Sequence, residues 1–353
     1  MRKFIFSLFS IFILLALPLQ ARAAAPTIVG PDDREEITGK AVGPEKAVVV
    51  IEIQQKGNSY LCSGAMVAPN IVLTAAHCLI DDKEGNYAKK VSVYAVGISN
   101  AESHDMLQIN DSHKEQTSKL NSTSNIKQNF TITQNNGRIT SLSEDLMNGA
   151  VNLIKDAIQK EKKLRRIGWG VNNWSLHVYP FAEAEQLWTP DNFIKHIKDN
   201  THEYVLSHKS TDDYGLIKLN YNLGDITGWL GLKVPSYEEL NNADIVIIGR
   251  GADKSDRSLW MSPGDIGVVS SDGIAFNADT LRGNSGSPVF KRGDMGNIIA
   301  LVNWGGADDI HLDEGYPNSG LRIRQEMIDA VETVANGGTL PGMKIIEDNS
   351  NQN

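Results

Sequence analysis

Short runs rich in Val and Ile, divided by turn residues, recur along most of this 353-residue chain. Such runs favour strands, and Gly, Asn, Asp and Pro favour the turns between them. Strands that do not alternate regularly with helices predict an antiparallel sandwich or barrel, because a parallel sheet needs crossover helices. We therefore expect an all-β fold with strands at 47–54, 64–67, 71–74, 90–95, 176–179, 214–219, 243–248, 265–270, 287–290 and 298–303.

Four other segments depart from this strand pattern. In 141–166 apolar residues recur at every fourth position, which places them on one face of an amphipathic helix. A similar apolar stripe predicts a C-terminal helix over 322–335. The stretch 103–138 is rich in Ser, Asn, Gln, Lys and Thr and has few aromatic residues, so it can form little core of its own. Residues 341–353 read as a disordered tail.

The first 23 residues have the pattern of a secretory signal peptide. Arg2 and Lys3 precede an apolar run at 4–17, and Ala-Arg-Ala at 21–23 fits a small-x-small cleavage site. The alternative is a membrane anchor, but a run of 14 residues is shorter than the roughly 20 that span a bilayer. We expect cleavage after Ala23 and a secreted mature protein, extracellular or periplasmic, without stable membrane association.

The charge balance of the chain is acidic. The formal net charge is −9, and removal of residues 1–23 leaves 31 basic against 43 acidic residues, a net charge of −12. Nucleic-acid binding needs an excess of Lys and Arg, and the acidic balance of this chain argues against nucleic acid as the main partner. His202 and His208 do not have a spacing that would place both on one helical face, and we predict no metal and no cofactor.

The sequence contains two cysteines, Cys62 and Cys78, which stand 16 positions apart. Export to an oxidising compartment would let them pair. They flank an alternating apolar run, which favours a disulfide between neighbouring strands or their ends. A closed loop of this length contributes about 3 kcal/mol in the chain-entropy model. Two buried free thiols are the alternative.

Three short stretches supply a histidine, an aspartate and a serine in chain order. His77 lies in TAAHC, Asp213 begins DYGLIKL, and Ser285 lies in GNSGSPV. A serine hydroxyl becomes a nucleophile when an imidazole takes its proton and a carboxylate orients the imidazole. Asp212 competes with Asp213 for the third role, and the apolar pattern that follows favours Asp213. The glycines around Ser285 would let the Gly283 and Ser285 amides form an oxyanion hole.

These blocks resemble the three signature blocks of the trypsin-like (chymotrypsin-fold) serine proteases, in that family's His, Asp, Ser order. GPDDREEIT, ITGWLG, GNSGSPVF and NWGG are similar to the bacterial glutamyl endopeptidase branch. The resemblance covers about 28–100 and 205–335. It implies two six-stranded antiparallel β-barrels with the site between them, and a Cys62–Cys78 disulfide behind His77. A partly helical insertion at about 101–175 would then interrupt one protease domain at 24–340. It would serve as an exosite, a lid or a surface for a partner, and decoration without a function is the alternative.

The resemblance also places a substrate pocket, where this chain departs from the glutamyl branch. Asp279 stands where trypsin-like enzymes keep the aspartate at the base of the pocket, which predicts cleavage after Arg or Lys. Thr280 matches the pocket threonine of the glutamyl endopeptidases, but Asn303 replaces their histidine. A glutamate preference and a purely structural Asp279 are the alternatives. The expected pocket walls are Val302, Gly305 and Gly320.

A second departure concerns maturation. Asn284 stands where trypsins have the aspartate that pairs with the new N-terminal ammonium, so Ile28 cannot form that ion pair. We expect a secreted serine endopeptidase that hydrolyses peptide or protein substrates through an acyl-enzyme. The rival hypothesis is a non-catalytic, protease-like binding protein, although proteins of that class usually lack a triad residue.

Overall fold

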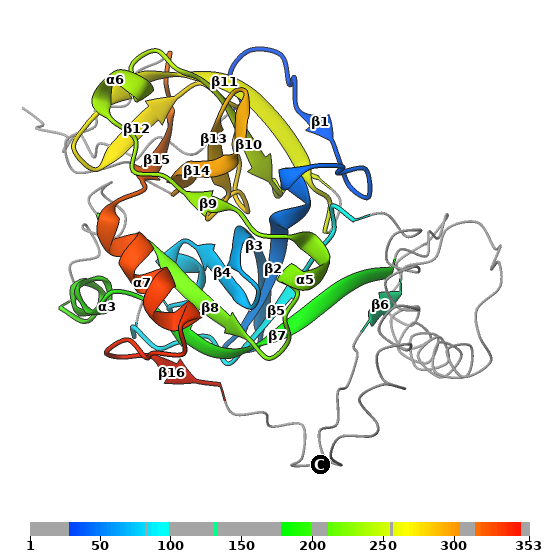
Figure 1. Cartoon of the computed structure of the whole chain (residues 1–353), viewed down its shortest axis with the longest axis vertical. Coiled ribbons are helices and arrows are strands. Elements are labelled where there is room, and N and C mark those ends of the chain that lie inside the picture. Colours follow the sequence, from blue (N-terminus) through cyan, green and yellow to red (C-terminus); the bar gives the residue numbers. More distant parts are fainter. Residues whose placement is uncertain are drawn as a thin grey trace, which may run out of the picture.

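The computed structural model describes residues 28–81, 84–98, 130–132, 178–199, 211–254, 257–303 and 315–346. Two closed β-barrels make up most of this part of the chain, one above the other in Figure 1. In the described part of the chain, no helix combines the length and the hydropathy that crossing a membrane requires.

The first barrel has six antiparallel strands. Its strands are β2 (Val48–Gln55), β3 (Asn58–Ala68), β4 (Ile71–Thr74), β5 (Lys90–Tyr94), β7 (Val178–Trp188) and β8 (Gly215–Leu219). They pair in the order β7-β5-β2-β3-β4-β8, and a further pairing of β7 with β8 closes the barrel. Fully buried Val, Ile and Leu side chains of β2, β4 and β8 fill its interior.

The second barrel also has six antiparallel strands. Its strands are β10 (Asp244–Gly249), β11 (Trp260–Val269), β12 (Gly273–Phe276), β13 (Pro288–Lys291), β14 (Asp294–Val302) and β15 (Asn318–Arg322). They pair in the order β11-β10-β13-β14-β15-β12, and β11 pairs with β12 to close the barrel. The expected pair of six-stranded antiparallel barrels is therefore confirmed.

Short elements decorate the barrels. Four two- or three-residue strands extend the sheets: β1 (Glu35–Glu36) on β11, β6 (Phe130–Ile132) on β7, β9 (Gly231–Leu232) on β14 and β16 (Lys344–Ile345) on β7. The helices are η1 (Pro44–Ala47), η2 (Ala76–Cys78), α3 (Asp191–Lys198), α5 (Gly224–Thr227), α6 (Tyr237–Leu240) and α7 (Gln325–Ala335).

The predicted C-terminal helix is α7. It buries Met327, Ala330, Val331 and Val334 in the core of the first barrel, although the strand before it, β15, belongs to the second. Figure 1 shows α7 descending from the second barrel onto the first. The helix begins later than the stripe at 322–335 implies, because Arg322 still pairs in β15. The chain thus returns to the first barrel after completing the second.

The structure corrects some expected boundaries. Each strand predicted from the sequence has a counterpart, but β12 and β15 were not predicted, since GIAF and NSGLR are short and contain residues that disfavour strands. The expected tail begins too early, because β16 pairs with β7 and the Pro341 carbonyl accepts the Trp188 indole N–H at 2.8 Å. The signal peptide and the helix at 141–166 lie outside the described residues, as does most of the insertion at 101–175.

Candidate active site

His77 lies in the short helix η2, directly after β4, at the edge of the first barrel. The disulfide predicted from the sequence is present and joins Cys62 of β3 to Cys78 of η2. The Tyr60 hydroxyl also donates to the Cys78 carbonyl at 3.1 Å. The single turn that carries His77 is therefore fixed to the barrel by a covalent bond one residue away.

Asp213 lies against His77 and uses both of its carboxylate oxygens. Oδ1 accepts the His77 backbone amide at 2.9 Å, and Oδ2 lies 2.8 Å from the ring Nδ1. The approach follows from sheet register, because β8 begins two residues later and Gly215 pairs with Thr74 of β4. Asp212 instead lies 3.9 Å from Arg324, so the geometry selects Asp213 over Asp212 as the partner of His77.

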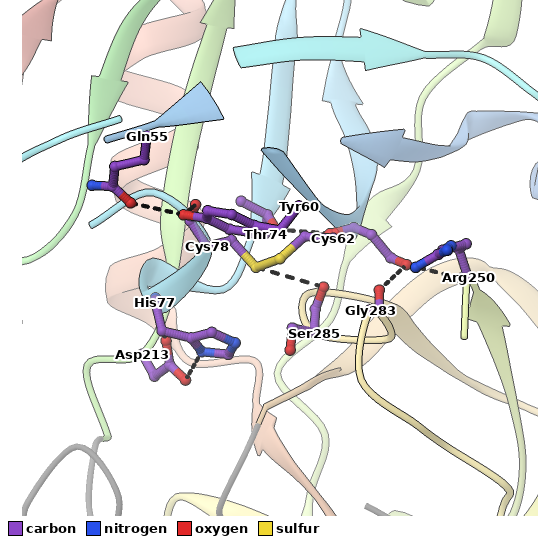
Figure 2. The surroundings of a disulfide bond; sticks show 11 residues. Gln55, Tyr60, Cys62, Thr74, His77, Cys78, Asp213, Arg250, Gly283 and Ser285 are labelled. Carbon is purple, nitrogen blue, oxygen red and sulfur yellow. Dashed lines mark hydrogen bonds and ion pairs between the residues drawn. A yellow bond between two sulfur atoms is a disulfide. The ribbon is translucent and has the colours of Figure 1, made fainter. Parts of the chain in front are cut away.

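Ser285 lies in a loop whose backbone is held by the first barrel. The Ser63 amide donates to the Ser285 carbonyl at 2.9 Å, and the Ser63 hydroxyl donates to the Gly283 carbonyl at 2.8 Å. The same hydroxyl accepts the Arg250 amide at 2.9 Å. In Figure 2 the His77 ring lies between Asp213 and Ser285. Ser63 was not among the residues expected at the site, although it stands next to Cys62 in the CSGA stretch.

Position 286 must be glycine because there is no room for a side chain there. Its φ of +79° lies in the left-handed region, and a Cβ there would stand 2.2 Å from Thr74 Oγ1 and 2.4 Å from the Ser63 carbonyl. Those two groups are themselves hydrogen-bonded at 2.7 Å. Only glycine lets the Ser285 loop pass this close to β3 and β4.

The amides around Ser285 have different partners. The Asn284 amide donates to Leu281 at 3.0 Å, and the Gly286 amide donates to Val302 at 2.7 Å. Within the described part of the chain, the Gly283 and Ser285 amides have no such acceptor. The side-chain oxygen of Asn284 accepts the Leu281 amide at 3.0 Å, so this side chain closes the loop on itself.

The His77 ring is partly open to solvent, with a side-chain exposure of 24%, whereas the Asp213 side chain is 8% exposed. Burial favours the neutral imidazole and lowers the pKa of His77, but the charge of Asp213 and its hydrogen bond outweigh burial. The net result is a pKa of His77 above its ordinary value of about 6.5.

Asp279 is 2% exposed and faces the N-terminal segment. Its Oδ1 accepts the Val29 amide at 2.6 Å, and its Oδ2 has no hydrogen-bond partner among the described residues. Burial raises the pKa of this carboxyl. The link between residues 250 positions apart has no signal in the sequence.

Two of the other expected pocket residues lie in strands of the second barrel. Val302 pairs with Gly320 across β14 and β15. Thr280 and Asn303 are both buried. The backbone nitrogen of Asn303 lies 3.4 Å from the Ser319 carbonyl oxygen. Gly305 lies outside the described residues.

Comparison with known proteins agrees with this architecture. A family model described as Trypsin matches residues 37–182, which include His77 and end before Asp213. A glutamyl endopeptidase of Bacillus licheniformis is 21% identical over 317 residues, which cover 88% of this chain and 70% of that protein. The structure of a Glu endopeptidase in complex with MPD shares the fold, with a TM-score of 0.51 and 18% identity over 88% of this chain and 99% of that one.

A Bacillus subtilis protein described as an extracellular metalloprotease is 20% identical over 313 residues, which cover 88% of this chain and 70% of that protein. That description applies to the relative. Among the residues described for this chain, no group of three or more His, Cys, Asp or Glu side chains could hold a metal ion. The matched family model, the similarity to glutamyl endopeptidases and the two closed barrels together support a trypsin-like serine protease close to the glutamyl endopeptidase branch.

Proposed function

We propose that this serine endopeptidase cleaves peptide bonds through Ser285 as nucleophile, His77 as general base and then acid, and Asp213 as the group that orients His77. The observation that carries the proposal is the double contact of Asp213 with His77, at 2.8 and 2.9 Å. The bond to Nδ1 fixes the tautomer in which Nδ1 bears the proton, so Nε2 keeps its lone pair for the Ser285 hydroxyl.

The reaction then follows from the groups in place. As Ser285 Oγ attacks the substrate carbonyl carbon, its proton passes to His77 Nε2, and the resulting imidazolium is stabilised by Asp213. The amides of Gly283 and Ser285, free of acceptors in the described structure, donate to the oxyanion. His77 next protonates the leaving amine as the C–N bond breaks. Water then attacks the acyl carbon and gives its proton to His77, which returns the proton to Ser285 Oγ as the acyl bond to Ser285 breaks.

A serine-directed phosphonylating probe tests the mechanism against the rival, a non-catalytic binding protein. The mature wild-type protein should be labelled at Ser285 and should hydrolyse a denatured protein substrate. Ser285→Ala should lose both properties, whereas Ser287→Ala, two residues along the same loop, should keep the labelling. A wild-type protein that is not labelled, or a Ser285→Ala variant that turns over substrate at the wild-type rate, would refute the proposal.

For the residue before the scissile bond we propose Arg or Lys. The Asp279 carboxylate is buried with one neutral donor, the Val29 amide, and its second oxygen has no partner among the described residues. A buried carboxylate in this state gains from a cationic donor. The alternative is cleavage after Glu, which the names of the relatives favour. Peptides that differ only before the scissile bond separate the two, since equal cleavage after Arg and Glu would exclude a preference for basic residues.

We also propose that the protein acts outside the cytoplasm. Support comes from the signal-like sequence at 1–23, from the disulfide, and from the description of the Bacillus subtilis relative as extracellular. N-terminal sequencing of protein recovered from the periplasm or medium should find a new terminus at or after Ala24.

Deletion of residues 103–138 tests whether the insertion contacts a protein substrate, because loss of turnover on proteins but not on peptides would support that role.

A further inference from the structure

Arg324, the residue immediately before α7, contacts the turn that leads into Asp213. Its Nη2 donates to the Thr211 carbonyl at 2.6 Å and lies 3.9 Å from Asp212 Oδ1. Its Nη1 donates to Asp272, in the hairpin between β11 and β12, at 3.1 Å. One guanidinium therefore connects the turn before Asp213, in the first barrel, to a hairpin of the second.

The two sides of Asp213 are held by different means. After it, the chain enters β8, whose register on β4 is fixed by Gly215 and Thr74. Before it, the described residues 211 and 212 form a tight turn, in which the Tyr214 amide donates to the Asp212 carbonyl at 2.8 Å. Arg324 supplies a side-chain anchor on this side, where Asn192 also hydrogen-bonds to Asp212.

Arg324 also forms an ion pair with a second carboxylate beside the site, that of Asp212. The Arg324 side chain is 16% exposed and that of Asp212 is 20% exposed, so their attraction is only partly screened by solvent. Burial raises the pKa of Asp212, and the charge of Arg324 opposes that rise. The guanidinium carbon lies 6.0 Å from the ring centre of Tyr214, on the other side of Asp213 in sequence. Arg324 thus contacts residues on both sides of Asp213.

We propose that Arg324 is a positioning residue for the site: it fixes the turn at 211–212 so that both oxygens of Asp213 meet an N–H group of His77. This inference rests on the proposed triad. Hydrogen bonds of 2.8 and 2.9 Å tolerate little displacement, and a shift of about 1 Å in a catalytic group can cost on the order of 100-fold in rate. A shift of the turn would pass directly to Asp213, since no residue lies between Asp212 and Asp213.

Arg322 provides a matched control. It stands two residues earlier and donates to the Ser270 and Ser271 carbonyls of the same β11–β12 hairpin and to the Pro235 carbonyl, but no described contact joins it to the Asp213 turn. Arg324→Met should lower kcat by about 10-fold or more while KM changes less than about twofold. Arg324→Lys should recover part of the loss, and Arg322→Met should retain the wild-type kcat.

The pKa of His77 is the measurement that is specific to positioning. It is determined by NMR titration of the imidazole in a Ser285→Ala background, so the measurement does not depend on turnover. Asp213 raises this pKa, so Arg324→Met should lower it and Arg322→Met should leave it unchanged. An unchanged pKa and kcat in Arg324→Met, or equal effects in both variants, would overturn the inference. If Arg324→Met does not fold, Arg324→Gln serves in the same comparison. Failure of the triad itself would be seen separately, as turnover by Ser285→Ala.

Discussion

Asp213 accepts two N–H groups of one residue: the backbone amide of His77 at 2.9 Å and the ring Nδ1–H at 2.8 Å. A carboxylate held this way has a fixed direction as well as a fixed distance. The backbone contact positions it, and the ring contact conveys its charge to the imidazole. Because η2 is tied to β3 by the disulfide, both members of the pair rest on the first barrel.

This pair sets the expected pH dependence. The pKa of His77 is raised above its ordinary value, so kcat/KM should rise with pH through a midpoint above about 6.5, as the imidazole becomes neutral. Asp213→Asn should lower that midpoint and reduce kcat by a factor on the order of 10⁴. In the folding equilibrium the same raised pKa stabilises the native state below about pH 6.5, and this contribution is lost as pH rises through the native pKa. A pH–rate profile that keeps its midpoint in Asp213→Asn would contradict this view of the pair.

The buried carboxylate of Asp279 should decide between substrates. Loss of a hydrogen bond to a charged group costs about 1.5–3 kcal/mol, so Asp279→Asn should lower kcat/KM on an Arg peptide by about 10- to 100-fold. Hydrolysis of a matched Gln peptide should change little. Asp294→Asn, in β14 of the same barrel, is the control for a general effect of removing an acid. If Asp279→Asn improved cleavage after Glu and left cleavage after Arg unchanged, the preference for basic residues would be wrong.

Substitutions at Gly286 and Gly293 distinguish the cost of an unfavourable backbone conformation from the cost of steric overlap. Both have positive φ, +79° and +89°, but a Cβ at Gly286 would overlap Thr74 and Ser63, whereas one at Gly293 meets nothing within 4 Å. Gly293→Ala should cost about 1 kcal/mol of unfolding free energy, the price of the backbone conformation alone. Gly286→Ala should cost at least about 2 kcal/mol more, because the Ser285 loop must move. Denaturant titration of both variants measures the difference, and equal losses would show that crowding is unimportant.

The disulfide should contribute to stability more than to the chemistry, although Cys78 stands next to His77. Replacing both Cys62 and Cys78 by serine should lower the unfolding free energy by about 3 kcal/mol, as expected for a closed loop of this length. The wild-type protein in reductant should approach the variant. The variant should keep measurable activity at low temperature, since Asp213 still fixes His77 through two hydrogen bonds. Denaturant curves with and without reductant check the first expectation, and complete inactivity of a folded variant would contradict the second.

Arg34 should stabilise the N-terminal segment that precedes β2 of the first barrel. Its side chain is 2% exposed and pairs with Asp32 at 2.8 Å and with Asp253 at 2.5 Å. Arg34→Met should cost on the order of 2 kcal/mol, whereas Lys233→Met, which breaks the exposed pair with Glu239, should cost less than about 1 kcal/mol.

The ion pairs of Arg34 with Asp32 and Asp253 should also make the unfolding free energy depend on pH in acid. Hydrogen bonds from Arg34 hold the pKa of Asp32 and that of Asp253 below their ordinary value. The stabilisation is present at neutral pH and is lost as pH falls below about 4 towards the native pKa values. The stability difference between wild type and Arg34→Met should therefore shrink in acid. A difference that is constant between pH 7 and pH 3 would count against the ion pairs.

The sequence alone predicts the three segments that bring His77, Asp213 and Ser285, the pair of cysteines and the runs of residues that form most strands. These are local properties, because β-branched residues favour extended backbone and each motif needs only its neighbours in the chain. It also led to the correct fold through the resemblance that those motifs carry.

Which side chains meet depends on the tertiary structure. It selected Asp213 over Asp212, turned Asp279 towards Val29, and brought Arg324 to the turn before the site. It also made strands of the Gly- and Asn-containing segments β12 and β15, whose local preference is weak. In each case the cause is a hydrogen bond between distant parts of the chain, whose partner is set by barrel closure and sheet register, and no local pattern of residues encodes that partner.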